Sequence, residues 1–358
     1  MVPFAPSPTS AESRVTLWYM EDNKWERDYI GEDLFRATFP NGRIVPYKRT
    51  WKKESIERLL DPDHVNVLSQ LGLTIEPPLS CGRTKELLRL LKPAAAIFLS
   101  DESGGDGSWC MFKETAKAAR VVFRQYAVPA LAYNQKYTNL SNVHTIPAGW
   151  MAGAWGLENG ARAGGQAPVK PATERSLKWS FVGQRKMKID LGITAFGSLR
   201  PNYVHDVWNA TGAMVAATYN DSVFVLQRRG NTHWDCLRHA EAAKAGAIPV
   251  VVAENRDIID NTWRHYTGYM GKLPPFIFHT DWRKAREEAE LLLKQPKTLL
   301  ERQLAVRQWY DAVMRAARAA LAAAVEQGPF EPTPEPPTPG PPPTPPPPPQ
   351  GIRRNRRG

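Results

Sequence analysis

A strand–helix–strand pattern stands out in the second half of the chain. Residues 223–226 are a short apolar run of β-branched and aromatic side chains, long enough for a strand and too short for a helix. Good helix formers occupy residues 234–244, and Gly246 follows where a helix commonly ends in the left-handed conformation. Residues 248–252 are a second apolar run. The pattern predicts a β-α-β unit, and the helix N-terminus after its first strand is suited to binding phosphate.

The rest of the chain repeats this alternation of short apolar runs with amphipathic stretches. Further strands are predicted at residues 15–20, 94–99, 121–123, 143–147 and 179–182. Further helices are predicted at residues 53–60, 87–91, from 108 onwards, 281–294 and 299–326. Alternating strands and helices predict a parallel sheet covered on both faces, so the fold class is α/β.

Composition divides the chain into four parts. Residues 156–174 are rich in Gly, Ala and Pro and predict a linker between an N-terminal half, residues 1–155, and a C-terminal half, residues 175–327. The N-terminal half is short for a complete Rossmann-like unit. Residues 328–358 are dominated by proline and end in a basic cluster, so they cannot form a packed core and predict an extended tail. A solvated spacer is favoured over a tail of the cell-wall type.

Arg238 and Glu241 are the charged pair of the predicted helix. They lie three residues apart and therefore share one face, close to the face that packs on the sheet. Helix patterning alone favours an exposed ion pair. The alternative places the planar donors of Arg238 on a diphosphate and the carboxylate of Glu241 on ribose hydroxyls. A charge near the packing face is costly unless a polar group meets it.

The residues around this pair resemble a known family. The run S-V-F-V-L-x-x-x-G-N-x-x-x-x-x-L-R-x-x-E-A-x-x-A-G-A-I-P-V-V, residues 222–251, is similar to the C-terminal signature of exostosin-like glycosyltransferases. Residues 98–102, 122–126 and 142–150 follow the order of the family's upstream segments. The resemblance spans residues 95–315 and is strongest to the subgroup of ribitol xylosyltransferases.

This resemblance implies a GT-B arrangement, in which two Rossmann-like halves face a cleft and the C-terminal half holds a nucleotide sugar. Carried over by position, Arg238 contacts the diphosphate and Glu241 the ribose. Gly230 and Asn231 line the donor loop, and with Thr232 they supply the turn and the N-cap of the helix. The Gln-Arg-Arg before Gly230 departs from the small or proline-containing turn of the family.

Four further residues are candidates for binding the donor or an acidic acceptor. Gly183 and Arg185 follow the strand at residues 179–182 and resemble the first loop of the donor half, at the end of the sheet where ligands bind. Arg124 ends an apolar strand and is predicted to hold phosphate or an acidic acceptor, or to pair with Asp101. His233 is predicted to contact phosphate or to belong to the helix cap.

Asp101 and Glu102 are the candidate catalytic residues. They follow the strand at residues 94–99, where catalytic groups on such sheets are placed. An inverting sugar transfer needs a base that takes the proton of the acceptor hydroxyl, and either carboxylate can serve. The competing interpretation is that Ser100-Asp101-Glu102 caps the next loop or helix.

The net charge of +11 and the pI of about 9.5 indicate anionic partners. The densest basic cluster, residues 48–53, includes a tryptophan, but a single cluster of this size is more typical of a solvated face than of a nucleic-acid surface. A nucleotide sugar or an acidic glycan accounts for the same charge. We therefore expect a nucleotide-sugar donor and a glycan or glycoprotein acceptor as partners, and no nucleic acid.

Cysteines and carboxylates give no sign of a metal site. The chain has three cysteines without paired spacing, Cys81, Cys110 and Cys236, which excludes a disulfide framework and a zinc site of the usual pattern. One disulfide between Cys81 and Cys110 can still form if the protein is luminal. Asp61-Pro62-Asp63 has the spacing of a manganese motif, but it follows a helical stretch and predicts a turn. We expect no metal or other cofactor, because arginine and helix-end N–H groups can stabilise a leaving diphosphate.

The chain has no apolar run of membrane-spanning length, and residues 1–13 lack the apolar core of a secretory signal. The resemblance implies the Golgi lumen, and the sequence leaves the compartment open. The predicted function is an inverting hexosyl or pentosyl transfer from a nucleotide sugar, with UDP favoured, to a glycan or glycoprotein hydroxyl. Two alternatives remain: a catalytically inactive protein that binds sugar nucleotides or glycans, and a proline-tailed structural protein of a wall or matrix.

Overall fold

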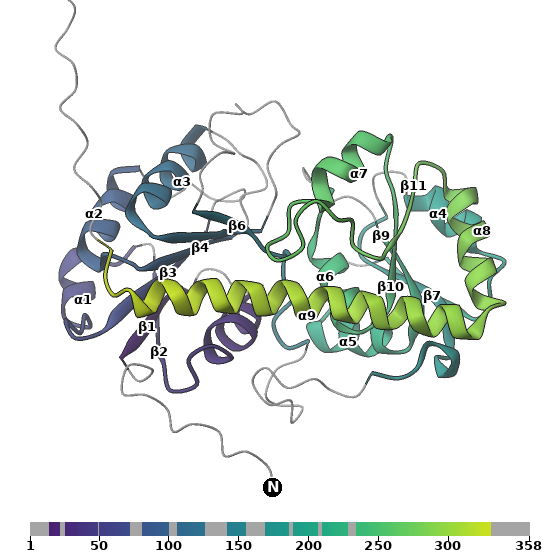
Figure 1. Cartoon of the computed structure of the whole chain (residues 1–358), viewed down its shortest axis with the longest axis horizontal. Helices are drawn as coiled ribbons and strands as arrows, with labels where there is room; N and C mark the ends of the chain where they lie inside the picture. Colours follow the sequence, from purple (N-terminus) through teal and green to yellow (C-terminus); the bar gives the residue numbers. More distant parts are fainter. Residues whose placement is uncertain are drawn as a thin grey trace, which may run out of the picture.

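Two parallel sheets flanked by helices make up the computed structural model (Figure 1). The structure describes residues 14–21, 26–48, 50–71, 81–99, 106–125, 142–154, 169–185, 189–206, 210–227 and 234–330. Every strand pairing within the two sheets is parallel. Parallel pairing requires crossover connections, and helices supply most of them.

The N-terminal half contains a six-stranded sheet in the order β2-β1-β3-β4-β5-β6. Its strands are β1 (Val15–Met20), β2 (Arg43–Tyr47), β3 (Val65–Leu71), β4 (Ala95–Leu99), β5 (Val121–Arg124) and β6 (Val143–Thr145). Its helices are the π-helix η1 (Tyr29–Arg36), α1 (Lys53–Glu57), α2 (Cys81–Leu91) and α3 (Asp106–Ala118). All six side chains of β1 are buried, as expected for a central strand covered on both faces.

The C-terminal half contains a five-stranded sheet in the order β11-β10-β9-β7-β8. Its strands are β7 (Leu177–Val182), β8 (Asn202–His205), β9 (Ser222–Gln227), β10 (Ile248–Val252) and β11 (Ile277–His279). Its shorter helices are the 3-10 turn η4 (Ala172–Glu174), α4 (Ile189–Phe196), α5 (Gly212–Asn220), α6 (Leu237–Lys244), α7 (Arg256–Trp263) and α8 (Trp282–Leu293). β9, α6 and β10 form the β-α-β unit that the apolar pattern predicts.

The last helix, α9 (Pro296–Glu326), runs across both halves (Figure 1). It contacts β10, α6 and α8 in one half and β3, β4, β5 and η1 in the other. Pro296 stands in the first turn of α9, where its missing N–H costs nothing. At the other end, Arg120 of the N-terminal half donates to the carbonyl of Gln327 at 3.0 Å, which satisfies one of the unpaired carbonyls there.

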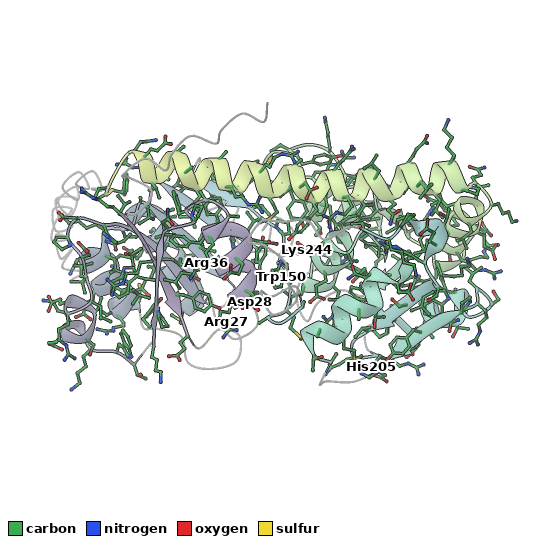
Figure 2. The ribbon with its side chains drawn as sticks, turned by 90° about the horizontal axis from the view of Figure 1, so that it is seen from below. Arg27, Asp28, Arg36, Trp150, His205 and Lys244 are labelled. Carbon is green, nitrogen blue, oxygen red and sulfur yellow. The ribbon has the colours of Figure 1, made fainter. Side chains whose placement is uncertain are left out.

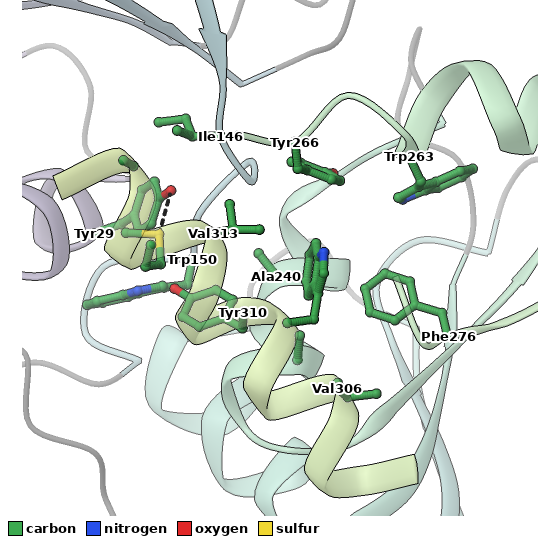
Figure 3. Close-up of a cluster of buried hydrophobic side chains, with 14 of the residues drawn as sticks. Tyr29, Ile146, Trp150, Ala240, Trp263, Tyr266, Phe276, Val306, Tyr310 and Val313 are labelled. Carbon is green, nitrogen blue, oxygen red and sulfur yellow. Dashed lines mark hydrogen bonds between the residues drawn. The ribbon is translucent and has the colours of Figure 1, made fainter. Parts of the chain in front are cut away.

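The chain crosses between the halves through residues 146–154, which are held from both sides. In the N-terminal half, Tyr29 donates to the carbonyl of Pro147 at 3.1 Å and Gln125 donates to that of Ala148 at 2.8 Å. Figure 3 shows Tyr29 and the indole of Trp150 beside α9. With these bonds and its buried side chains, residues 146–150 are part of the core. Residues 156–168 of the predicted linker lie outside the described residues.

The structure changes one local expectation and confirms two. α6 begins at Leu237 with Cys236 as the N-cap, so the cap is not Thr232. The backbone N–H of Cys236 donates to Nδ1 of His239 at 3.1 Å, so a side chain of the helix satisfies the backbone donor of its N-cap residue. Gly246 does end the helix with φ +68°, as predicted, and Asp281 caps α8 by accepting from the N–H of Lys284 at 3.0 Å.

Gly149 and Gly153 allow a matched test of how tightly the crossing segment is packed. Both have positive φ, +84° and +78°, but an added Cβ at Gly149 meets the ring of Tyr29 at 2.2 Å, whereas nothing lies within 4 Å of one at Gly153. We expect Gly153→Ala to cost about 1 kcal/mol of backbone strain. Gly149→Ala should cost about 1–3 kcal/mol more, through overlap with the ring.

The measurement is urea unfolding of both variants beside the wild type. Equal losses of stability for the two variants would show that the contact between Gly149 and Tyr29 is loose enough to relax, and would contradict the rigid crossing described above.

Candidate functional site

The order of the C-terminal sheet identifies one end of it as a candidate ligand site. β8 lies on one side of β7, and β9, β10 and β11 follow in turn on the other side. The strands that follow β7 and β9 in the chain are therefore added on opposite sides of this pair, which makes it the topological switch point of the sheet. In open α/β sheets ligands bind outside the carboxyl ends of the strands at such a point. The predicted donor loops follow these two strands.

The loop after β7 begins with Gly183, whose φ of +149° is disfavoured for residues with a side chain. Its N–H donates to the carbonyl of His205 at 3.0 Å, which joins the carboxyl ends of β7 and β8. Arg185 pairs with Asp190 at 2.6 Å, and 44% of its side chain is exposed. The structure thus places Gly183 and Arg185 at the carboxyl end of β7, with the guanidinium on the surface.

Five predicted site residues lie outside the described residues. These are Gly230, Asn231 and His233, which follow β9 in the sequence, and Asp101 and Glu102, which follow β4. Arg124 is described at the end of β5, only 6% exposed, with its guanidinium 4.5 Å from the centroid of the Phe112 ring of α3. Its predicted pairing with Asp101 lies outside the described residues.

Arg238 and Glu241 lie about one turn apart on α6, and they are not the exposed ion pair that helix patterning favours. Nη1 of Arg238 donates to Oε2 of Glu241 at 2.5 Å, and the Glu241 side chain has no exposed surface. The other oxygen, Oε1, accepts the N–H of Met151 at 3.0 Å. The polar partner that the packing face requires is thus a backbone group of the crossing segment.

Arg238 keeps part of its guanidinium available. Its side chain is 21% exposed, and among the described residues no partner other than Glu241 accepts from it. Gln227, the last residue of β9, donates to the carbonyl of Arg238 at 3.0 Å and fixes the helix against the switch point. Burial acts to lower the pKa of Arg238, but the Glu241 carboxylate outweighs this and holds the pKa above its usual value. The side chain therefore stays positively charged at any working pH.

A buried polar cluster underlies the start of α6. Asp235 is 4% exposed and accepts a short hydrogen bond from the hydroxyl of Tyr266. Burial raises the pKa of Asp235 to about 7, although the bond from Tyr266 opposes this. Burial likewise lowers the pKa of His239 to about 4, so its imidazole is neutral near pH 7. Figure 3 shows Tyr266 near Trp263, and the ring of Trp263 packs against His239.

This cluster is joined to the N-terminal half through the backbone. Tyr266 forms an isolated parallel bridge with Thr145 of β6, and the N–H of Thr267 donates to the carbonyl of Thr145 at 2.9 Å. Sequence reasoning missed Asp235, His239 and Tyr266. The signal available in the sequence was Asp235, an acidic residue just before the helix. The bridge between Tyr266 and β6 joins residues far apart in the sequence, so the local pattern could not predict it.

A second buried carboxylate, that of Asp33 on η1, joins the halves at the opposite end of α6. Its Oδ2 accepts from the indole N–H of Trp150 at 2.8 Å and makes a close ion pair with Lys244. The ammonium of Lys244 lies 4.5 Å from the centroid of the Trp150 ring, and Figure 2 shows the two side chains together between the halves. Tyr310 and Arg318 of α9 donate to the same residue. Sequence reasoning missed this network as well.

The described residues include two of the three cysteine side chains and no cluster suited to a metal ion. Cys81 is disulfide-bonded and Cys236 is not, and the remaining cysteine, Cys110, has a side chain outside the described residues. Within the described ranges, no group of three or more His, Cys, Asp or Glu side chains is arranged to hold a metal ion. None of the described helices has the length and apolar content needed to cross a membrane.

Solved structures share this arrangement of two halves. The alpha-glucosyltransferase in complex with UDP and a 13-mer DNA containing a HMU base matches with a TM-score of 0.51 at 9% identity, covering 87% of this chain and 99% of that one. Its complex with UDP and a 13-mer DNA containing an A:G mismatch gives 0.50 at 11% identity, covering 85% and 95%. Arabidopsis thaliana UGT89C1 complexed with UDP gives 0.39 at 12% identity, covering 87% and 92%.

These likenesses establish the fold and leave the family open. No protein-family model and no curated protein sequence matches the chain, so the resemblance to exostosin-like enzymes stays a prediction. At such identities the alpha-glucosyltransferase structures bear on the fold alone. The predicted fold class is confirmed: the chain is an α/β protein of GT-B type, with one parallel sheet in each half.

Asp235→Asn tests the buried carboxyl. Because the pKa of Asp235 is about 7 in the folded protein and about 4 in an unfolded chain, the unfolded state releases the proton first as pH rises. The wild type therefore loses stability between about pH 4 and pH 7, by up to roughly 3 kcal/mol, and the asparagine variant lacks this loss.

The measurement is the difference in melting temperature between this variant and the wild type across that pH range. It should be small at pH 4 and grow in favour of the variant up to pH 7. His239 titrates with the opposite sign, and its Nδ1 lies 3.6 Å from Oδ1 of Asp235, so the same comparison is made in a His239→Gln background. A difference that does not change with pH would contradict the raised pKa.

Proposed function

We propose that this chain transfers a sugar from a nucleotide-sugar donor to an acceptor hydroxyl. The observation that carries the proposal is Arg238, a cation with a partly exposed side chain that the buried Glu241 holds at the switch point of a parallel sheet. Arginine presents a planar set of donors that matches phosphate oxygens, and the N-terminus of α6 adds free N–H groups and a positive dipole end. The GT-B fold supports the same class of reaction, as an analogy of fold.

Within this proposal Arg238 binds the diphosphate, and Glu241 holds Arg238 in place before the donor binds. The ribose role that the resemblance implies for Glu241 is less consistent with its surroundings, because its side chain has no exposed surface and both oxygens accept bonds from protein groups. The loops that contain Gly183 and Gly230 complete the donor site at the ends of β7 and β9. UDP is the proposed nucleotide, since both alpha-glucosyltransferase structures contain it.

The proposed reaction is a direct displacement with inversion. A carboxylate, Asp101 or Glu102, takes the proton of the acceptor hydroxyl while its oxygen attacks the anomeric carbon and the nucleoside diphosphate leaves. Arg238 and the N–H groups at the start of α6 stabilise the charge on the leaving diphosphate. A glycan or glycoprotein hydroxyl is the first candidate acceptor. Donor binding without turnover would instead support a protein that only binds sugar nucleotides.

Arg238→Ala, with Arg286→Ala as its control, tests the donor site. Loss of a charge-assisted bond to diphosphate should weaken UDP binding about 10- to 150-fold, the equivalent of about 1.5–3 kcal/mol. Arg286 forms a comparable pair with Glu290 at 2.6 Å on α8, far from the switch point, so its loss should leave the affinity unchanged. Calorimetric titration with UDP and GDP, and with their sugars, measures both. Absence of nucleotide binding by the folded wild type would rule the proposal out.

We propose duplex DNA as the second candidate acceptor, although the sequence alone led us to expect no nucleic acid as a partner. Two observations support it: the net charge of +11, and the DNA in both alpha-glucosyltransferase structures. Binding that depends on phosphate charge weakens steeply as salt is raised. A DNA acceptor also needs a free hydroxyl on a base, such as the HMU base that one of those duplexes contains.

A transfer assay separates the two acceptor classes. Labelled UDP-glucose and related donors are offered with a duplex containing a HMU base, with the same duplex containing thymine, and with a set of glycans. A DNA acceptor predicts label on the HMU duplex alone, in amounts that fall as salt is raised. Label on a glycan and none on the HMU duplex would exclude DNA and favour the first candidate.

A further inference from the structure

The hydroxyl of Tyr219 is buried without a hydrogen-bond partner. Tyr219 lies near the end of α5, has no exposed surface, and its Oη bonds to no group in the described part of the chain. The backbone of the same residue is well held, because its carbonyl accepts from Nη1 of Arg175 at 3.0 Å. Buried hydroxyls are rarely left unpaired, and each exception calls for an explanation.

The surroundings of Tyr219 connect it to the donor site. It belongs to a buried cluster with Val182 and Val225, from the strands that flank the switch point, and with Ala242 of α6. On α6, Arg238 lies one turn before Ala242 and Glu241 directly precedes it, and the charges of both act on the Tyr219 hydroxyl. Burial raises the pKa of Tyr219 well above its usual value, so the hydroxyl keeps its proton and is a donor at any working pH.

We infer that Tyr219 is a positioning residue for the donor site: its hydroxyl donates to Glu241 when Arg238 turns from Glu241 to the diphosphate. The inference rests on the proposed function. It assigns the hydroxyl two states, unpaired in the free protein and bonded to the Glu241 carboxylate in the donor complex.

The physical reason is the complete burial of Glu241. When Arg238 turns to phosphate, Oε2 of Glu241 loses its charge-assisted bond in a place that water does not reach. An uncompensated buried carboxylate is strongly unfavourable, and this cost would oppose donor binding. A neutral hydroxyl nearby replaces the lost bond and at the same time satisfies its own donor. The Tyr219 hydroxyl is thus unpaired before the donor binds, and afterwards both this hydroxyl and the Glu241 carboxylate have partners.

Tyr219→Phe, with Tyr47→Phe as its control, separates this role from a packing role. Tyr47 is 1% exposed, and its hydroxyl donates to the carbonyl of Ser69 at 3.0 Å in the N-terminal half. Tyr47→Phe should lower the melting temperature and leave UDP affinity unchanged. Tyr219→Phe removes an unpaired hydroxyl, so it should leave the melting temperature unchanged or raise it, and weaken UDP binding about 3- to 10-fold.

Melting curves and calorimetric titration with UDP, on the full chain, give both quantities for each variant. Wild-type affinity in Tyr219→Phe, with binding lost in Arg238→Ala, overturns the inference and leaves the proposed function intact; a buried water on Tyr219 would give this result. A Tyr219→Phe variant that melts lower and binds UDP like the wild type makes the residue structural only. Failure of the folded wild type to bind any nucleotide overturns both proposals.

Discussion

The carboxylate of Glu241 is the charge that the rest of the candidate site depends on. It has no exposed surface, so both of its oxygens must find donors inside the protein. One donor, the N–H of Met151, comes from the segment that joins the halves, and the other comes from Arg238 on its own helix. The guanidinium therefore takes its direction from the way the chain crosses between the halves. Its placement depends on the whole fold and not on α6 alone.

A second buried carboxylate repeats this arrangement about one turn further along the same helix. Asp33 of the N-terminal half pairs with Lys244, the last residue of α6, and also accepts from Trp150. Helix α6 is thus bonded to groups outside its own sheet at two positions, Glu241 and Lys244. Two buried charges, which stabilise little by themselves, set the register between the halves because breaking either pair would leave an uncompensated charge. Such pairs specify one arrangement more than they add to stability.

What the sequence could predict was local. The apolar runs of β9 and β10 and the glycine after α6 follow from neighbours in the chain, and the three-residue spacing of Arg238 and Glu241 was correctly taken to place them on one face. The burial of Glu241 could not be predicted, because its second partner lies 90 residues away. β2 was missed since Pro46 interrupts it, which an edge strand tolerates. The start of α6 was predicted too early because its N-cap is a cysteine, Cys236, and not one of the usual hydroxyl or carboxylate residues.

Helix α9 has a consequence for the order in which the protein acquires its structure during synthesis. The chain leaves the ribosome from its amino end, and domains generally fold in that order. Here the N-terminal sheet is made first, but Tyr310 and Arg318, which bond to Asp33, are among the last described residues to emerge. The apolar faces of β3, β4 and β5 that α9 covers stay exposed until α9 has been made. A nascent chain therefore carries an uncovered face of the first sheet until α9 has been made, and this face is the surface that a ribosome-bound chaperone would meet.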